Sequence, residues 1–141
     1  MKKQQGFTLI ELLVVIAIIG LLSTLAVVAL NNARMKSRDA KRISDIKQIQ
    51  TALELYYNDA NAYPATADVT SGGDIAIGTV TYMATVPTNP SPEADGECND
   101  GNSYVYNALT GQTSYTLTYC LGGTTGGVTA GEHTATPNGI Q

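Results

Sequence analysis

The feature that most constrains this chain is an apolar run near its N-terminus that contains a single acid. From Phe7 to Leu30 nearly every residue is apolar, residues 12–30 carry no charge, and Glu11 is the one ionisable side chain. A helix of this length would be roughly 36 Å long, which is enough to cross a bilayer. The sequence therefore predicts a membrane-spanning helix that holds a carboxylate near its start.

Glu11 needs a partner, because a carboxylate within a bilayer-length helix costs on the order of a few kcal/mol. No Lys or Arg lies between Lys3 and Arg34, so no side-chain cation is near it. Cleavage of the chain between Gly6 and Phe7 would create a new α-amine close by. We therefore expect that cleavage at this junction creates a positive charge and that assembly uses it.

Two other kinds of segment are alternatives. Lys2, Lys3 and the small residues at Val27-Val28-Ala29 fit a secretory signal peptide, but the apolar run is longer than the usual roughly 7–15 residues and contains Glu11. An ordinary transmembrane anchor fits the length and leaves Glu11 unexplained.

Charge is segregated along the 141 residues. Six basic residues follow the apolar run, and the chain from Gln48 to the C-terminus has nine acids and no Lys or Arg. We call the six the basic collar: Arg34, Lys36, Arg38, Lys41, Arg42 and Lys47. We call residues 48–141 the acidic head, and its negative charge argues against nucleic-acid binding. Because the collar adjoins the apolar run, lipid headgroups are the favoured contact for it.

The helix is predicted to continue through residues 31–61, which contain neither Pro nor Gly. Apolar residues recur there at three- and four-residue spacing, as in an amphipathic helix. The apolar stripe is Ala33, Ala40, Ile43, Ile46, Ile49, Leu53, Tyr56, Tyr57 and Ala60; the solvent face is assigned Arg38, Lys41, Arg42, Asp45 and Glu54. Tyr63-Pro64 ends the pattern, since a residue before Pro avoids helical geometry. One helix of roughly fifty residues is expected.

The remaining residues have the composition of a small β domain. Residues 65–78 are predicted as a loop and residues 79–83 as a short strand. Alternation on both sides of Thr110-Gly111-Gln112 predicts a hairpin with one apolar face: Tyr104, Tyr106, Ala108, Tyr115, Leu117, Tyr119 and Leu121. This face is expected to pack on the helix at Ile46, Ile49, Leu53 and Tyr57, with the tyrosines as core residues rather than a stacking platform.

The two cysteines, Cys98 and Cys120, both lie in the acidic head. Two thiols are too few for a zinc site without histidine, and the one histidine, His133, lies in a Gly/Thr-rich segment expected to be a flexible tail. Pairing the hairpin about its turn places Cys120 opposite Gly101. We expect a disulfide that closes a loop of about 20 residues and contributes roughly 3 kcal/mol, with two reduced, buried thiols as the alternative.

The N-terminus resembles that of type IV pilins and type II secretion pseudopilins. The matching residues are Lys2-Lys3, Gly6-Phe7-Thr8-Leu9-Ile10-Glu11 and the apolar run through Gly20. The resemblance implies cleavage after Gly6 by a membrane aspartic peptidase, N-methylation of Phe7, and pairing of Glu11 with the amine of a neighbouring subunit. It implies an α+β pilin-like fold, with one long helix packed on a small antiparallel sheet.

Five regions are expected on this basis: a leader (1–6), a transmembrane and assembly segment (7–30), an amphipathic helix (31–61), a β head (62–121) and a C-terminal segment (122–141). The implied partners are identical subunits in a filament, the prepilin peptidase, an inner-membrane assembly platform and the lipid bilayer. The head is expected outside the inner membrane, first on a single-pass anchor and then in an extracytoplasmic filament. No nucleic acid is expected, and no catalytic constellation is visible, so the chain is not expected to be an enzyme.

Looser similarity to major pseudopilins over 37–42, 46–53, 63–64 and 86–90 favours a secretion pseudopilus. A type IV pilus pilin for adhesion, motility or DNA uptake is one alternative, and a membrane-anchored extracytoplasmic binding module that never polymerises is another. The expected effect of Glu11→Ala is intact cleavage with lost or slowed filament assembly.

The chain departs from the family in three respects. It lacks a proline near Val28 that would help the helix unwind, which leaves Gly20 as the softest point. The resemblance to major pseudopilins also implies calcium binding by acidic residues in the C-terminal loops. The nearest acidic cluster here lacks the spacing of an EF-hand loop, so a solvated loop is favoured over a calcium site; the calcium candidates are Glu93, Asp95, Glu97 and Asp100, with Asn99 and Asn102 nearby. Third, six basic residues follow the span and two precede it, which by the positive-inside rule favours the opposite orientation.

Overall fold

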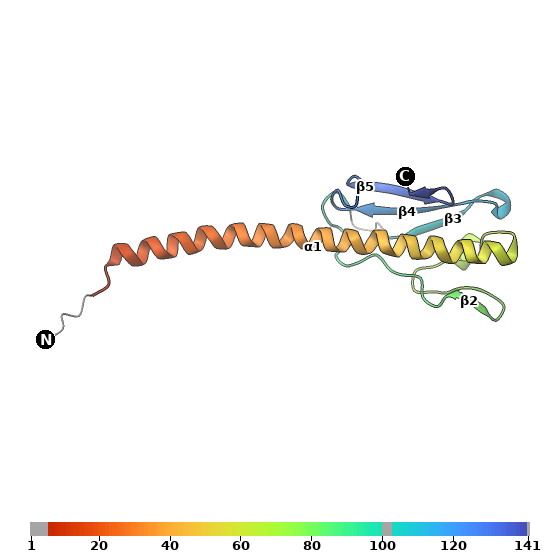
Figure 1. Cartoon of the computed structure of the whole chain (residues 1–141), viewed down its shortest axis with the longest axis horizontal. Helices are drawn as coiled ribbons and strands as arrows, with labels where there is room; N and C mark the ends of the chain where they lie inside the picture. Colours follow the sequence, from red (N-terminus) through yellow and green to blue (C-terminus); the bar gives the residue numbers. More distant parts are fainter. Residues whose placement is uncertain (1–5, 100–102, 141) are drawn as a thin grey trace. The chain divides into compact units, whose positions relative to one another are not determined.

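The computed structural model describes residues 6–99 and 103–140. The chain divides into two units, Met1–Arg34 and Met35–Gln141, and each is described by itself. The main element is α1 (Leu9–Ala60), a helix of 52 residues, which confirms the single long helix expected from the absence of Pro and the helical spacing (Figure 1).

The first unit is an apolar helical segment without internal cover. Every residue from 6 to 34 is exposed, and by length and composition α1 is able to cross a membrane. Its two mid-segment hydroxyls are satisfied within the helix, since Ser23 donates to the carbonyl of Ile19 (2.7 Å) and Thr24 to that of Leu21 (2.8 Å). An apolar surface of this extent needs a bilayer or other protein chains around it.

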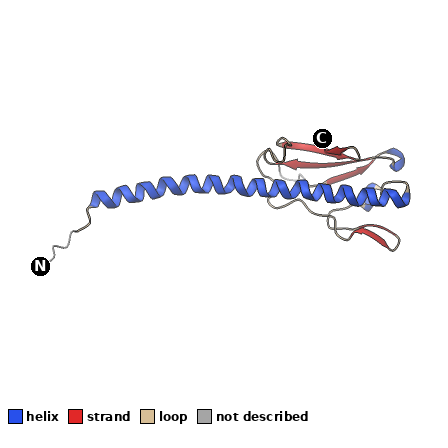
Figure 2. Ribbon diagram, in the orientation of Figure 1, coloured by secondary structure: helices blue, strands red, loops and turns tan. Residues whose placement is uncertain are grey.

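The second unit combines the rest of α1 with two antiparallel sheets. One sheet has four strands in the order β3-β4-β5-β6, and the other is the hairpin β1-β2. Figure 2 shows these strands flanking the last turns of the helix. The bounds are β1 (Ile75–Ile77), β2 (Val80–Met83), β3 (Val105–Ala108), β4 (Tyr115–Leu121), β5 (Gly131–Thr136) and β6 (Gly139–Ile140), with 3-10 turns η1 (Thr66–Asp68) and η2 (Thr110–Gln112). The α+β class and the short strand after residue 79 are confirmed.

The predicted apolar face forms the core. Ile46, Ile49 and Leu53 of α1 are fully buried against Tyr115 and Leu117 of β4. The tyrosines contribute ring contacts, and two of their hydroxyls reach polar atoms: Tyr106 donates to the carbonyl of Pro64 (2.8 Å) and Tyr104 to Asp45 (3.1 Å). Their assignment to the core is confirmed.

The predicted register of the β3–β4 hairpin is wrong by two residues. Tyr106 pairs with Leu117, whereas a register that places Cys120 opposite Gly101 would pair it with Tyr115; Gly101 itself lies outside the described residues. The loop is longer than expected, because the amide of Leu109 donates to the carbonyl of Ser114 (2.9 Å) and η2 fills the turn. A slip of two residues keeps every side chain on its face, so alternation alone does not detect it.

Two segments expected to lack regular structure contain strands. The Gly/Thr-rich tail forms β5 and β6, and β5 pairs with β4 along five residues, including His133 opposite Tyr119. The loop predicted over residues 65–78 contains η1 and ends in β1. The strands β5 and β6 have few apolar side chains, and β1 is only three residues long, so pairing with neighbouring strands, rather than a local pattern, determines all three.

The predicted solvent face of the helix is wrong at two positions. Arg42 is fully buried and Asp45 is 4% exposed, whereas Ala40 and Ala60, assigned to the apolar stripe, are exposed. Asp39 is also fully buried. Burial of charged side chains requires partners, and these partners form the charged cluster described below.

Candidate functional sites

The predicted processing junction lies just before α1. Gly6, Phe7 and Thr8 are not helical, and all three are exposed. Non-helical, exposed backbone is what a protease requires for access to a peptide bond. The structure thus leaves the Gly6–Phe7 bond accessible.

Glu11 has a partner within the chain, and that partner is Thr8. The amide N–H of Thr8 donates to Glu11 Oε2 (2.8 Å), and the Thr8 hydroxyl donates to the same oxygen (2.6 Å). In return the amide of Glu11 donates to the Thr8 hydroxyl oxygen (3.2 Å). This arrangement is a capping box, which satisfies free N–H groups at the first turn of a helix. Sequence reasoning missed Thr8, although the Thr-x-x-Glu spacing signals it.

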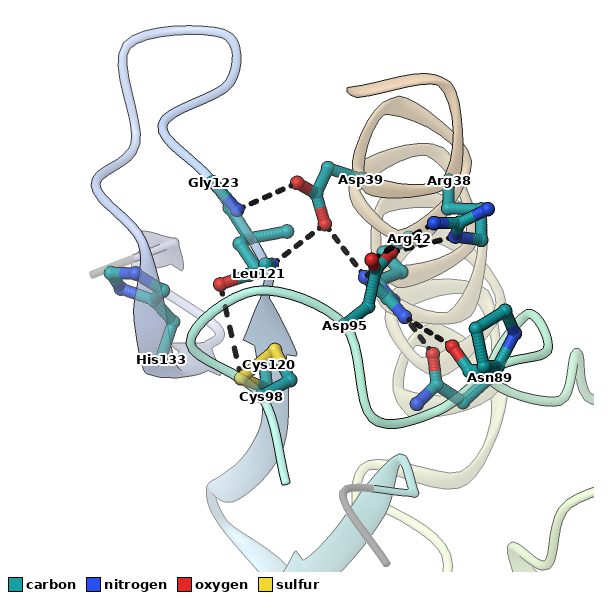
Figure 3. Close-up of polar contacts among 12 residues, drawn as sticks. Arg38, Asp39, Arg42, Asn89, Asp95, Cys98, Cys120, Leu121, Gly123 and His133 are labelled. Atoms are coloured by element: carbon teal, nitrogen blue, oxygen red, sulfur yellow. Dashed lines mark hydrogen bonds and ion pairs between the residues drawn. A yellow bond between two sulfur atoms is a disulfide. The ribbon is translucent and has the colours of Figure 1, made fainter. Parts of the chain in front are cut away.

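The charged cluster, in contrast to this N-terminal cap, lies wholly within the second unit (Figure 3). It consists of Arg38, Asp39, Arg42 and Asp95. Asp39 accepts hydrogen bonds from the amides of Gly122 and Gly123, each at 2.9 Å, at the end of β4. Arg42 Nη1 donates to the same carboxylate (2.7 Å). Neither side chain is exposed, so Asp39 links the helix to β4 through a buried, fully bonded carboxylate.

Arg42 extends these contacts to the loop before residue 95. Its Nε donates to Asn89 Oδ1 (2.8 Å) and its Nη2 to the carbonyl oxygen of Pro92 (3.2 Å). A guanidinium has several donors in a fixed plane, which suits it to hold separate segments together. The buried arginine therefore joins α1 to the loop that carries Asn89 and Pro92.

Arg38 holds the next part of that loop. Its Nε and Nη2 donate to the two oxygens of Asp95 at 2.6 and 2.9 Å, a bidentate pair. The loop approaches β4 so closely that a Cβ on Gly96 would collide with the carbonyl oxygen of Gly122. Gly96 also has a φ of +59°, which favours glycine.

The disulfide predicted between Cys98 and Cys120 is present, with Cα atoms 5.8 Å apart. The two cysteines are 22 residues apart in sequence. A disulfide that closes a loop of this size is expected to contribute roughly 3 kcal/mol to the free energy of unfolding. Cys98 follows Asp95 by three residues and Cys120 precedes Gly122 by two, so the covalent link and the charged cluster fasten the same two segments.

The calcium candidates that the structure describes, Glu93, Asp95 and Glu97, do not form a metal site. Asp95 is bonded to Arg38, Glu97 is exposed, and Asp100 lies outside the described residues. Within residues 6–99 and 103–140, no three His, Cys, Asp or Glu side chains, Glu93 included, are arranged to hold a metal ion.

We call the second unit, Met35–Gln141, the head. The Asp95–Arg38 pair predicts that the stability of the head is sensitive to acid. The hydrogen bond from Arg38 holds the pKa of the Asp95 carboxyl below its usual range. A group with a lowered folded-state pKa stabilises the fold above its unfolded pKa, near 4, and loses that contribution as the pH falls further. We expect Asp95→Asn to lower stability by about 1–3 kcal/mol at pH 7 and by much less at pH 3.

The measurement is thermal melting followed by near-ultraviolet circular dichroism. All eight tyrosines lie between Tyr56 and Tyr119 and the chain has no Trp, so this signal reports on the head alone. Equal melting differences between wild type and Asp95→Asn at pH 7 and pH 3 would contradict the prediction.

Comparison with known proteins bears on the N-terminal segment first. Residues 1–27 match a family model described as the prokaryotic N-terminal methylation motif. A probable minor fimbrial protein of Dichelobacter nodosus is 31% identical over 124 residues, which cover 84% of this chain and 72% of that protein. The chain belongs to the type IV pilin and pseudopilin family. Proteins of this family are structural and non-enzymatic.

Several relatives of this pilin-family chain carry the name type II secretion system core protein G. That of Vibrio cholerae is 35% identical over 92 residues, 65% of this chain and 56% of that protein. That of Escherichia coli K12 is 45% identical over 64 residues, 45% of this chain and 44% of that protein. The chain spans about half the length of these curated relatives. No solved structure matches it at a significant level.

Proposed function

We propose that this protein is a structural subunit of a helical filament, the pseudopilus of a type II secretion system. The observation that carries the proposal is the exposed apolar half of α1, which has Glu11 in its first turn and no charge from residue 12 to 30. The relatives named type II secretion system core protein G support the secretion branch.

In this proposal residues 1–6 are a leader that a prepilin peptidase removes, and the new amine of Phe7 is methylated. Residues 7–30 anchor the chain in the inner membrane, with residues 31–141 outside. The assembly platform then moves the subunit from the bilayer into the filament, where neighbouring subunits cover the apolar helix. Glu11 of one subunit pairs with the Phe7 amine of the next. A buried ion pair contributes register more reliably than net stability.

The basic collar bears on the orientation. Three of its six residues have carboxylate partners in the folded head: Arg38 contacts Asp95, Lys41 contacts Asp45, and Arg42 contacts Asp39. These cations therefore have a structural role in the head. That role supports a head and collar on the same side of the membrane. It also gives these three cations a function other than cytoplasmic retention, although the positive-inside rule alone favours a cytoplasmic collar.

A type IV pilus pilin is the second candidate function. The Dichelobacter nodosus protein, whose name refers to fimbriae, aligns with 84% of this chain, more than the secretion relatives do. A membrane-anchored binding module that does not polymerise is a third, and it leaves both the methylation motif and Glu11 without a role.

The processing step is tested by intact mass of the chain purified from bacteria that contain prepilin peptidase. We expect a mature chain that starts at N-methylated Phe7. Gly6→Val should accumulate as uncleaved chain, because the peptidase needs a small residue before the cut. Gly20→Ala is the matched control and should be processed normally, since a Cβ at either glycine meets no atom within 4 Å. A wild-type chain that starts at Met1 or after Ala29 would reject the filament class.

The two filament functions are separated by deletion of the gene in its own host. Loss of protein secretion with surface pili retained supports the pseudopilus, and loss of surface pili with secretion retained supports the pilus. Complementation with the wild-type chain should restore whichever phenotype is lost.

A further inference from the structure

An open groove follows the outward side of α1 within the head. It has a volume of about 440 Å³ and is lined by Ala40, Ile43, Ser44, Lys47, Gln48 and Thr51. A second hollow shares Lys47 and Thr51 and continues to Asn138 and Gly139, next to β6. The two hollows meet at Lys47 and Thr51, and the second also contains Glu54 and Tyr115. In the first hollow Lys47 is the one charged side chain, so this groove is suited to receive a protein surface that carries acids.

Lys47 lacks an acid partner in the folded head. Among the described residues neither Lys47 nor Lys36 forms an ion pair, whereas Arg38, Lys41 and Arg42 each contact a carboxylate. Of the collar residues in this unit, Lys36 and Lys47 are thus left for a partner outside the chain.

The complementary charges lie where α1 ends. Asp59, Asp68 and Asp74 fall between the last turn of α1 and β1, and all three are exposed. In the part of the chain that the structure describes, none of them forms an ion pair. The hydroxyl of Tyr82 donates to Asp59 (2.6 Å), which orients this carboxylate without neutralising it. We call these three residues the acidic end of the head.

We propose that the groove at Lys47 binds the acidic end of the head of a second copy of this chain. Because Lys47 and the acidic end are different surfaces, the contact is heterologous, and a heterologous contact that does not close generates an open helical assembly. Lys47 and Asp59 are twelve residues apart on α1, so two parallel copies must be displaced by roughly 18 Å to bring them level. The inference deepens the proposed filament function and rests on it.

A lipid surface is the competing partner for these cations. The headgroup layer on each side of a bilayer is roughly 5–8 Å thick. Lys47 follows Leu30, the last residue of the apolar run, by 17 residues, or roughly 26 Å of helix. Lys47 is therefore too far along the helix for headgroups to be its main partner, which favours a second protein chain.

The test is charge reversal and rescue in the full-length chain. We expect Lys36→Glu/Lys47→Glu to reduce the yield of sheared filaments at least about tenfold, because facing like charges cost several kcal/mol. Adding Asp68→Lys/Asp74→Lys should restore the yield to within about threefold of wild type. Adding Glu93→Lys/Glu97→Lys, which changes the same number of charges elsewhere in the head, should not.

The controls separate this contact from folding and from the filament function itself. Each variant should accumulate to the wild-type level and retain the Cys98–Cys120 disulfide on non-reducing gels. If wild type forms no filament, the proposed function fails; if wild type and Lys36→Glu/Lys47→Glu form equal amounts, only this contact fails. Rescue by the Glu93/Glu97 reversal would also overturn it. So would loss of binding to phosphatidylglycerol vesicles without rescue by any acid reversal, which would assign the cations to lipid.

Discussion

Glu11→Ala is expected to abolish filament assembly while cleavage after Gly6 and methylation of Phe7 proceed. The chain has no other charge from residue 7 to residue 30, so nothing replaces this carboxylate as the partner of a neighbour's amine. Leaving one member of a buried pair uncompensated costs about 3–5 kcal/mol per contact. Since 1.4 kcal/mol is a factor of ten, each contact would be weakened roughly 100-fold or more. The yield of sheared filaments measures assembly, and the intact mass of the chain measures cleavage and methylation.

The cap formed by Thr8 provides the matched control. Thr8→Val removes the hydroxyl that donates to Glu11 and leaves the carboxylate in place. Loss of a helix cap costs roughly 1 kcal/mol, so we expect a moderate decrease in filament yield. Glu11→Gln keeps a hydrogen-bond acceptor for Thr8 but no charge, and it should fail like Glu11→Ala. Normal assembly of Glu11→Gln would show that capping, rather than charge, is what assembly requires.

The helix α1 was predictable from sequence, because a helix depends on local patterns. The absence of Pro from residue 7 to residue 63 and the helical spacing of Ile46, Ile49 and Leu53 determine α1. The absence of cations near Glu11 indicated the amine created by cleavage at Gly6 as its partner, and this stays a prediction. The Thr8 contact is equally local, but a pattern of charges does not reveal it because its donors are a hydroxyl and an amide.

The charged cluster was not predictable in this way. A period rule assigns a charged side chain to solvent, and it assigned Arg42 to solvent. Arg42 is buried because it donates hydrogen bonds to Asn89 and Pro92. These residues lie 47 and 50 positions away in sequence, and no local pattern signals contacts at that separation. The same limit explains why the partner of Asp95 was missed. Its acidic neighbours made Asp95 a calcium candidate, but in the folded head it pairs with Arg38.

The sheet shows a similar division. Alternation found β3, β4 and their buried face, since side chains of a strand alternate between its two faces. The strands β5 and β6 have little apolar content, and Ala135 is the one buried side chain among their described residues. Backbone pairing with β4 determines these strands, and composition suggested a flexible tail instead.

Asp39→Ala is expected to destabilise the head by about 3–5 kcal/mol, the cost of breaking a fully buried ion pair by removing one partner. The substitution leaves three donors without their acceptor: the buried amide of Gly122, the half-buried amide of Gly123 and Nη1 of the buried Arg42. For a domain near 100 residues this corresponds to a melting temperature lower by at least about 12 °C. Near-ultraviolet circular dichroism of the full chain in detergent measures it.

Lys41→Ala is the matched control for Asp39→Ala, because it removes an ion pair two residues further along the same helix. The side chain of Lys41 is 58% exposed, so its contact with Asp45 contributes less than about 1 kcal/mol. Asp39→Asn should lie between the two, since its amide retains one acceptor oxygen but presents an N–H group to a second backbone N–H. If Asp39→Ala melts no lower than Lys41→Ala, the disulfide and the hydrophobic core hold the loops around residues 95 and 122 to α1 without the charged cluster. A large loss confined to Asp39→Ala would establish the buried carboxylate as the link between the helix and the sheet.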